Sequence, residues 1–251
     1  MKPRSIAILA CLTAGLFSAS MARAEDKPPQ ISKTASDALQ AMGKTLAAGT
    51  FSFRDRTIRE YMDANGQPLH IFHTATVVVR RPDRLLVDLT GDDGTTKIAY
   101  DGKTLTLYGV EVKKYVIIPV PDNIEGMLTV AVSRLGVDFP LADFLTDAPD
   151  KAFLAGIASG FEVNTVSVDG TECRHFLFTQ PPGIELELWL EKNERAVPRR
   201  LIVTYRSLPG EPRFIAEMSD WNFNVHPADA GFAVHVPAGV TKIEFKQEKP
   251  K

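Results

Sequence analysis

The sequence predicts an α+β protein, mainly β, in which one strongly curved antiparallel sheet carries helices on its concave face. Two regions, 50–119 and 160–225, alternate apolar and polar residues in short runs, which is typical of half-buried antiparallel strands. Turn residues such as Asn65-Gly66 and Asp169-Gly170 separate the runs. A helical, apolar segment at 123–158 connects the two regions. Two strand sets joined in this way can form a single curved sheet, which leaves its concave face for the helices to cover.

The N-terminal 24 residues read as a cleavable signal peptide. A basic start precedes an apolar run, and Ala22-Arg23-Ala24 fits the small-x-small pattern of a signal peptidase site. The apolar run is shorter than the roughly 20 residues of a membrane span. We therefore expect a periplasmic protein that begins at Glu25, forms a single domain over 25–251 and has no integral membrane segment after signal cleavage. An uncleaved N-terminal anchor is the alternative.

The two cysteines have different predicted fates. Ile8-Leu9-Ala10-Cys11 is similar to a lipoprotein processing box, but it leaves too little apolar core before the cysteine, so we do not expect lipidation. Loss of the signal would leave Cys173 as the single cysteine, which excludes an internal disulfide. We expect a buried structural thiol there. The signal also carries three basic residues, so its loss shifts the formal net charge from −2 to about −5, which argues against nucleic acid as a partner.

Local signals place the helices. Residues 31–48 have apolar side chains at helical spacing, and Gly49 can end this helix. Asn123 can cap a second helix that ends at Gly136, and short helical pieces are expected over 137–158.

The strands come in two series. The first series, over 50–119, is expected to hold six strands. In the second, the segment 184–191 is apolar at every even position, so one face should cover apolar side chains and the other should meet water. A final short strand is expected near 240–246.

Several local phrases resemble the LolA-like superfamily of periplasmic lipoprotein carriers, outer-membrane receptors and RseB-type sensors. They are Arg80-Arg81-Pro82-Asp83-Arg84, Tyr100-Asp101-Gly102-Lys103-Thr104, Leu188-Trp189-Leu190-Glu191 with Val197-Pro198-Arg199-Arg200, and the closing segment 230–240. The similarity covers most of 34–246 and is strongest to a family of predicted periplasmic proteins within that class. The resemblance implies a half-open β-barrel with helices as a lid over an apolar cavity.

The expected function follows from that cavity. It is binding or transport of a hydrophobic ligand, such as an acyl chain, or of a lipid-modified partner such as a lipoprotein. The alternative is an envelope sensor that uses the same concave surface to regulate a partner protein. The expected lining residues are apolar positions on strands or on the helical insertion: Phe53, Val87, Ile98, Leu107, Leu128, Phe139, Phe144, Leu186, Leu188 and Val203. The aromatic residues Phe51, Phe53, Trp189, Trp221 and Phe223 could line the same pocket or form plain core.

No catalytic constellation is visible, so we expect no enzyme activity, cofactor or metal. His70 and His73 are three apart on a predicted strand, where they point to opposite faces and chelate one ion poorly. Glu185 and Glu187 share a strand face, but that face is the predicted solvated one. An exported hydrolase is the least supported alternative, because no nucleophile lies near a base.

Overall fold

The computed structural model describes residues 30–136 and 139–244. The predicted signal peptide and the predicted start at Glu25 lie outside the described residues. Within the described ranges, the longest apolar helical stretches are too short or too polar to pass through a bilayer.

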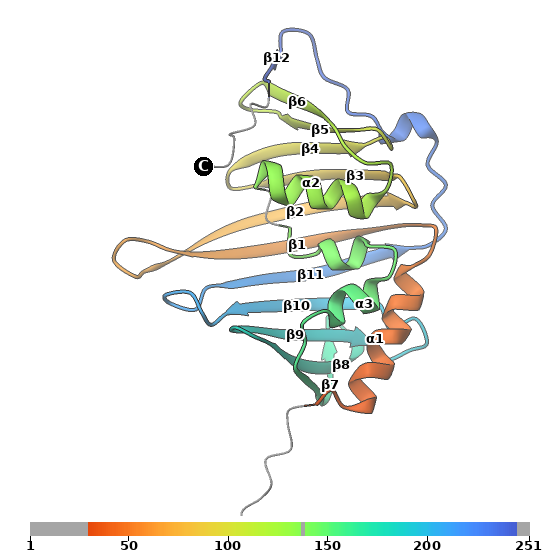
Figure 1. Ribbon diagram of the computed structural model, residues 1–251, viewed down its shortest axis with the longest axis vertical. Helices are drawn as coiled ribbons and strands as arrows, with labels where there is room; N and C mark the ends of the chain where they lie inside the picture. The colour runs from red at the N-terminus through yellow and green to blue at the C-terminus, as the bar shows by residue number, and fades with distance from the viewer. Residues whose placement is uncertain (1–29, 137–138, 245–251) are drawn as a thin grey trace, which may run out of the picture.

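Within the described ranges, twelve strands form one continuous sheet (Figure 1). The sheet order is β12-β6-β5-β4-β3-β2-β1-β11-β10-β9-β8-β7. The first meander contains β1 (Thr50–Met62), β2 (Pro68–Arg80), β3 (Arg84–Gly91), β4 (Gly94–Tyr100), β5 (Thr104–Gly109) and β6 (Lys114–Pro119). The second contains β7 (Ser159–Val168), β8 (Thr171–Gln180), β9 (Ile184–Glu191), β10 (Pro198–Tyr205) and β11 (Arg213–Asn222).

The two meanders are joined by β1 and β11. These strands pair antiparallel, with Ile58 opposite Ile215, although about 150 residues separate them in the chain. All neighbouring strands are antiparallel except β12 (Thr241–Lys242), which pairs parallel to β6. The prediction of one curved antiparallel sheet in a mainly β protein is confirmed.

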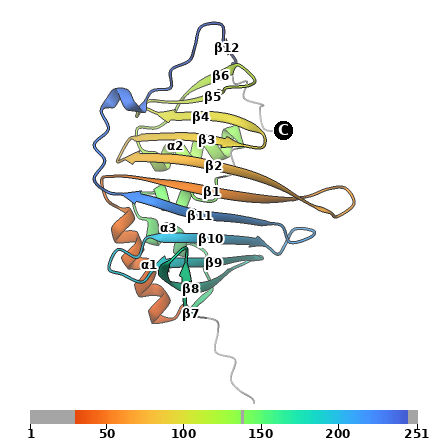
Figure 2. The same ribbon diagram turned by 180° about the vertical axis from the view of Figure 1, so that it is seen from behind.

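The helices α1, α2 and α3 lie on one face of this sheet (Figure 1), and the view from behind shows the strands in front of them (Figure 2). Their bounds are α1 (Lys33–Leu46), α2 (Ile124–Leu135), the 3₁₀ turn η1 (Ala142–Leu145) and α3 (Pro149–Leu154). A second 3₁₀ turn, η2 (Asp229–Phe232), follows the last meander strand.

Capping residues set the helix ends. The Asn123 side chain accepts a hydrogen bond from the Gly126 N–H at 2.7 Å, and Gly136 adopts the left-handed conformation, so both predicted limits of α2 are confirmed. The expected stop of α1 at Gly49 is wrong by a few residues. The helix ends at Leu46, because Ala47 leaves the helical conformation with ψ of 0° and the Ala48 N–H bonds to the Thr45 carbonyl, three residues back, at 3.2 Å.

Strands β7–β11 carry a solid core, which we call the packed half. Its covers are α1, η1 and α3. Phe153 from α3 meets Phe178 edge-on at 5.6 Å and stacks on Phe144 at 6.0 Å. Phe176, Phe178 and Leu188 are fully buried. A Cβ added at Gly43 would lie 2.5 Å from the Asp150 side chain, so the glycine lets α1 approach α3 closely.

A small second cluster forms on the opposite face of the sheet. It contains Val168, Cys173 and Trp189, with Trp189 stacked on His175 at 4.0 Å. The free Cys173 is fully buried, as predicted. Trp189 therefore does not reach the concave face, because it lies between the inward-facing Leu188 and Leu190 on a strand whose side chains alternate.

Candidate functional site

A cleft of about 160 Å³ opens on the concave face of the first meander. Its walls come from β1, β2, β3, β4 and β11, and the segment 139–141 forms its cover. The lining side chains are Asp55, Thr57, Arg59, His73, Ala75, Val77, Val87, Leu89, Ile98, Phe139, Pro140, Leu141 and Phe214.

A smaller hollow of about 50 Å³ lies beside this cleft, between α2 and strands β3–β5. Every side chain that lines it is apolar: Leu85, Val87, Ile98, Leu105, Leu107, Met127, Leu128, Ala131, Val132 and Phe139. The two spaces share Val87, Ile98 and Phe139, so they meet at these three side chains. We call the cleft, the hollow and strands β1–β5 the hollow half of the concave face, which meets the packed half at β11.

Wider depressions also lie on the surface, one of them adjoining the cleft at Thr57 and His73, but each carries several charged side chains. One of about 330 Å³ includes Arg56, Asp92 and Glu217, and another of about 420 Å³ lies along β6 and β12. A third, of about 450 Å³, lies between α1 and the end of β9 and includes Asp37 and Lys192. Among these spaces, apolar surface is most completely enclosed in the hollow half.

The ten residues expected to line a cavity all belong to the concave side or its lid, but they divide into two groups. Val87, Ile98, Leu107, Leu128 and Phe139 surround the cleft and the hollow. Phe53, Phe144, Leu186, Leu188 and Val203 line neither space and belong to the packed core. Their role in binding remains a prediction.

The aromatic cluster near Phe53 depends on a bulge in β11. The register shifts between Ser52 and Arg54, where Asp220 takes a positive φ of 53°. This extra residue turns Trp221 to the concave face, where it stacks on Phe53 at 4.5 Å and donates through Nε1 to the Pro198 carbonyl. Four of the five aromatic candidates thus meet in one cluster, and Trp189 is the exception.

One ionisable group of the cleft is deeply buried. Asp55 is 5 % exposed, and its Oδ1 has no hydrogen-bond partner among the described residues. Burial raises the pKa of Asp55 to about 6, and hydrogen bonding to Ala75 and the nearby His73 offset part of that effect. Sequence reasoning missed Asp55. The available signal was a carboxylate at a position that alternation assigns to the same face as Phe51 and Phe53.

The other polar side chains of the cleft are further toward the β1–β2 hairpin. Thr57 lies directly across from His73, whose Nε2 is 2.8 Å from an Asp93 carboxylate oxygen. The Arg59 guanidinium lies over the Phe214 ring at 5.2 Å. The cleft therefore has a polar end and an apolar end.

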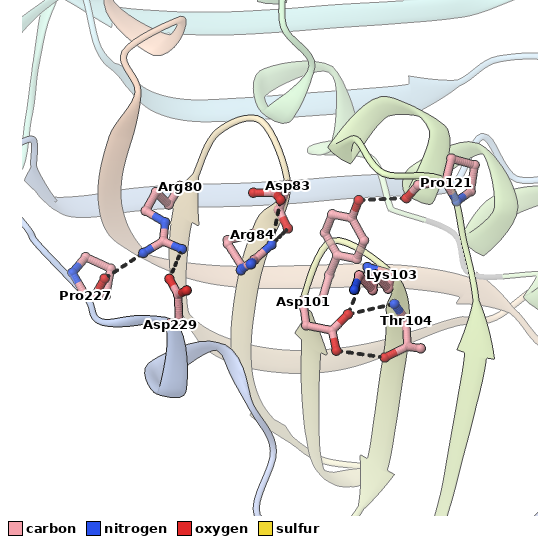
Figure 3. Close-up of polar contacts among 10 residues, drawn as sticks. Arg80, Asp83, Arg84, Asp101, Lys103, Thr104, Pro121, Pro227 and Asp229 are labelled. Atoms are coloured by element: carbon pink, nitrogen blue, oxygen red, sulfur yellow. Dashed lines mark hydrogen bonds and ion pairs between the residues drawn. The ribbon is translucent and has the colours of Figure 1, made fainter.

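The phrases that carried the family resemblance fix the strand ends at the margin of the lid (Figure 3). Asp101 accepts hydrogen bonds from the backbone of Lys103 and Thr104, and the Tyr100 hydroxyl donates to the Pro121 carbonyl at 2.7 Å. Arg80 donates to the Pro227 carbonyl and pairs with Asp229, as Figure 3 shows. These residues stabilise turns and hold the C-terminal segment.

Arg81 connects the sheet to its covers. Its guanidinium donates to the carbonyl of Leu145 in η1 and to the carbonyl of Leu46 at the end of α1. The side chain lies over the Phe51 ring at 5.9 Å. Arg81 is thus a structural anchor for the covers of the packed half.

Among the described residues, no group of three or more histidine, cysteine or acidic side chains is arranged to hold a metal ion. Consistent with their predicted opposite directions, His70 is 3.3 Å from Glu60 and His73 contacts Asp93. Glu185 pairs with Arg206, and Glu187 with His175. The absence of enzyme activity remains a prediction.

The fold and the cleft define a class of protein: an open, curved β-sheet with an apolar concave face under a helical lid. The chain belongs to the family described as predicted periplasmic protein (DUF2092), whose model matches residues 35–246. This match confirms the predicted family type and the periplasmic localisation. No curated protein matches the sequence.

Solved structures resemble the fold at low sequence identity. An uncharacterized conserved protein from Thermus thermophilus is 10 % identical with a TM-score of 0.49, covering 84 % of this chain and 99 % of that one. The Mycobacterium tuberculosis lipoprotein LppX is 17 % identical with a TM-score of 0.47, covering 78 % and 99 %. The LolA superfamily protein NE2245 from Nitrosomonas europaea is 13 % identical with a TM-score of 0.40, covering 78 % and 97 %.

Proposed function

We propose that this periplasmic protein binds or carries an apolar ligand, such as an acyl chain or the lipid of a modified partner, in the hollow half. The observation that carries the proposal is the wholly apolar hollow under α2, which adjoins the cleft at Val87, Ile98 and Phe139. Burial of acyl carbons contributes roughly 0.8 kcal/mol per CH₂, so a sixteen-carbon chain gains at most about 12 kcal/mol before association costs. Reversible affinity therefore needs no ion pair.

The volumes of the cleft and the hollow limit the size of ligand that they accept without a conformational change. Ligand pockets commonly measure about 300–1,000 Å³, whereas the cleft and the hollow measure about 160 and 50 Å³. A short apolar group fits, and a whole acyl chain requires Phe139 and α2 to move away from the sheet. Phe139 is only partly buried, so a shift of its ring alone exposes little further apolar surface.

The proposal is tested with an uncharged fluorescent probe, N-phenyl-1-naphthylamine, and its displacement by long-chain lipids. Leu107→Trp places a larger side chain in the hollow and should weaken probe binding by about tenfold or more. Thr106→Trp is the matched control, because Thr106 directly precedes Leu107 on β5 and lies on the other sheet face. This variant should bind the probe normally. A wild-type protein that binds neither probe nor lipid at micromolar concentration would contradict the proposal.

The sensor alternative remains a prediction. A partner protein that binds only the lipid-free form, with Leu107→Trp unaffected in that contact, would favour it.

A further inference from the structure

Asp55 stands out among the buried polar groups of the described residues. Only three side-chain polar atoms there are buried without a hydrogen-bond partner: Asp55 Oδ1, Arg81 Nε and Arg199 Nε. The two arginines have other contacts, since Arg81 donates to two carbonyls and Arg199 lies 3.5 Å from Glu191. Asp55 Oδ1 is the single acceptor in this group. Buried polar atoms are nearly always satisfied, so an orphaned carboxylate oxygen that lines a cleft requires an explanation.

The position of Asp55 on β1 is the second observation. Along the concave side of β1, Phe51 and Phe53 are buried in the aromatic core, and Asp55 follows them as the first polar residue. Thr57 and Arg59 come next and are partly exposed, and Tyr61 is 50 % exposed. This part of β1 runs into the hairpin that extends beyond the helices (Figure 1). Asp55 therefore lies where the closed core ends and the cleft begins.

The charges that face the cleft do not satisfy Asp55 Oδ1. His73 is engaged with Asp93, and Arg59 stacks over Phe214. Because burial raises the pKa of Asp55 only to about 6, the carboxyl is ionised at neutral pH. An ionised, buried and unpaired oxygen is a strong acceptor for any donor that enters the cleft.

We propose that Asp55 is the recognition residue of a polar subsite, and that the cleft takes a single-chain amphiphile whose polar end donates a hydrogen bond, through a hydroxyl or a primary ammonium group. This inference rests on the proposed function and specifies its ligand. The polar end lies at Asp55, and the chain passes Val77 and Val87 beneath Phe139 toward the hollow under α2. An amphiphile that ends in a carboxylate is disfavoured there by like charge.

The test compares ligands of one chain length with different polar ends. Affinities of dodecan-1-ol, dodecylamine and dodecyl methyl ether are measured by displacement of N-phenyl-1-naphthylamine. The wild-type protein should bind the alcohol and the amine at least about tenfold more tightly than the ether, because hydrogen bonds to a charged acceptor are strong ones. Asp55→Leu should abolish this preference and keep the affinity for the ether.

Two further variants separate recognition from folding. Asp88→Leu removes a carboxylate from the outer face of β3, where Asp88 pairs with Lys97, and should leave the preference intact. Asp55→Asn keeps the shape and an acceptor oxygen without the charge, so it should lose the extra affinity for the amine while retaining that for the alcohol.

Each outcome has a separate meaning. Equal affinities for alcohol and ether in the wild type, or a preference that survives in Asp55→Leu, would overturn the polar subsite and leave the proposed function standing. Failure of all three ligands and of the probe to bind the wild type would overturn the proposed function and the subsite with it.

Discussion

The two halves of the concave face have the same alternating strand pattern, but one half is filled by side chains and the other keeps open space. In the packed half, aromatic side chains from the covers fill the space: Phe144 and Phe153 are 1 % and 5 % exposed and stack on each other, and Phe153 meets Phe178 of the sheet edge-on. In the hollow half, α2 contributes aliphatic side chains such as Met127 and Leu128, and spaces remain around Phe139. The sheet supplies an apolar surface in both halves, so the volume of the covering side chains decides whether a cavity exists.

The largest expected contrast comes from a carboxylate placed in each half. Leu188→Asp puts a charge in a fully buried position and should lower the free energy of unfolding by about 4 kcal/mol or more. Leu107→Asp lies beside the hollow at a partly buried position and should cost about 1–2 kcal/mol. Urea denaturation followed by circular dichroism measures both. Equal losses would mean that the two halves are packed alike.

Truncation of one lid aromatic in each half should give a smaller difference in stability loss than the carboxylate substitutions. Phe144→Ala removes a buried ring from a close-packed site and should cost about 3–4 kcal/mol. Phe139→Ala removes a partly buried ring that already borders empty space, and should cost about 1–2 kcal/mol while enlarging the cleft. Thermal unfolding gives the stability difference. A greater loss for Phe139→Ala would contradict the division into two halves.

The buried carboxyl of the hollow half should also make the free energy of unfolding depend on pH, by about 3 kcal/mol in total. The pKa of Asp55 rises from 3.8 unfolded to about 6 folded, so the folded state binds the proton more tightly. The stabilisation from the protonated Asp55 carboxyl is fully present below about pH 4. It declines as the pH rises from about 4 to 6 and is lost above that range. His73 and Arg59 face the same cleft, and both are present in the wild type and in the Asp55→Asn variant that is compared with it.

The measurement is the difference in unfolding free energy between wild type and Asp55→Asn across about pH 4–7. The variant should gain relative to the wild type as the pH rises, by about 3 kcal/mol in total. Asp88→Asn, at an exposed ion pair, should show no such trend. If the difference in unfolding free energy between wild type and Asp55→Asn did not change with pH, Asp55 would not be a buried carboxyl with a raised pKa.

Local chemistry made much of the fold predictable. Asn123 and Gly136 bound α2 as expected, and Asp169-Gly170, both with positive φ, form the predicted turn between β7 and β8. Alternation also assigned Val87, Ile98 and Leu107 to the concave face, because side chains on a strand point to opposite faces in turn.

Three features depended on distant parts of the chain and were not predictable in this way. The pairing of β1 with β11 has no local signature. The turn of Trp221 into the core depends on a bulge at Asp220 that alternation does not reveal. The division of the predicted lining residues depends on how large the lid side chains are at each point, which periodicity cannot express.

The pairing of β1 with β11 also constrains how the protein forms. Each meander contains mostly local hairpins, which pair quickly, but one side of β1 remains an unpaired edge until a strand about 150 residues later arrives. Unpaired edges invite aggregation, and outward-facing charges oppose it. Arg54 and Arg56 occupy the outer face of β1 along this edge. We therefore expect the seam between the meanders to form late in folding, and a chain truncated before β11 to leave that edge exposed.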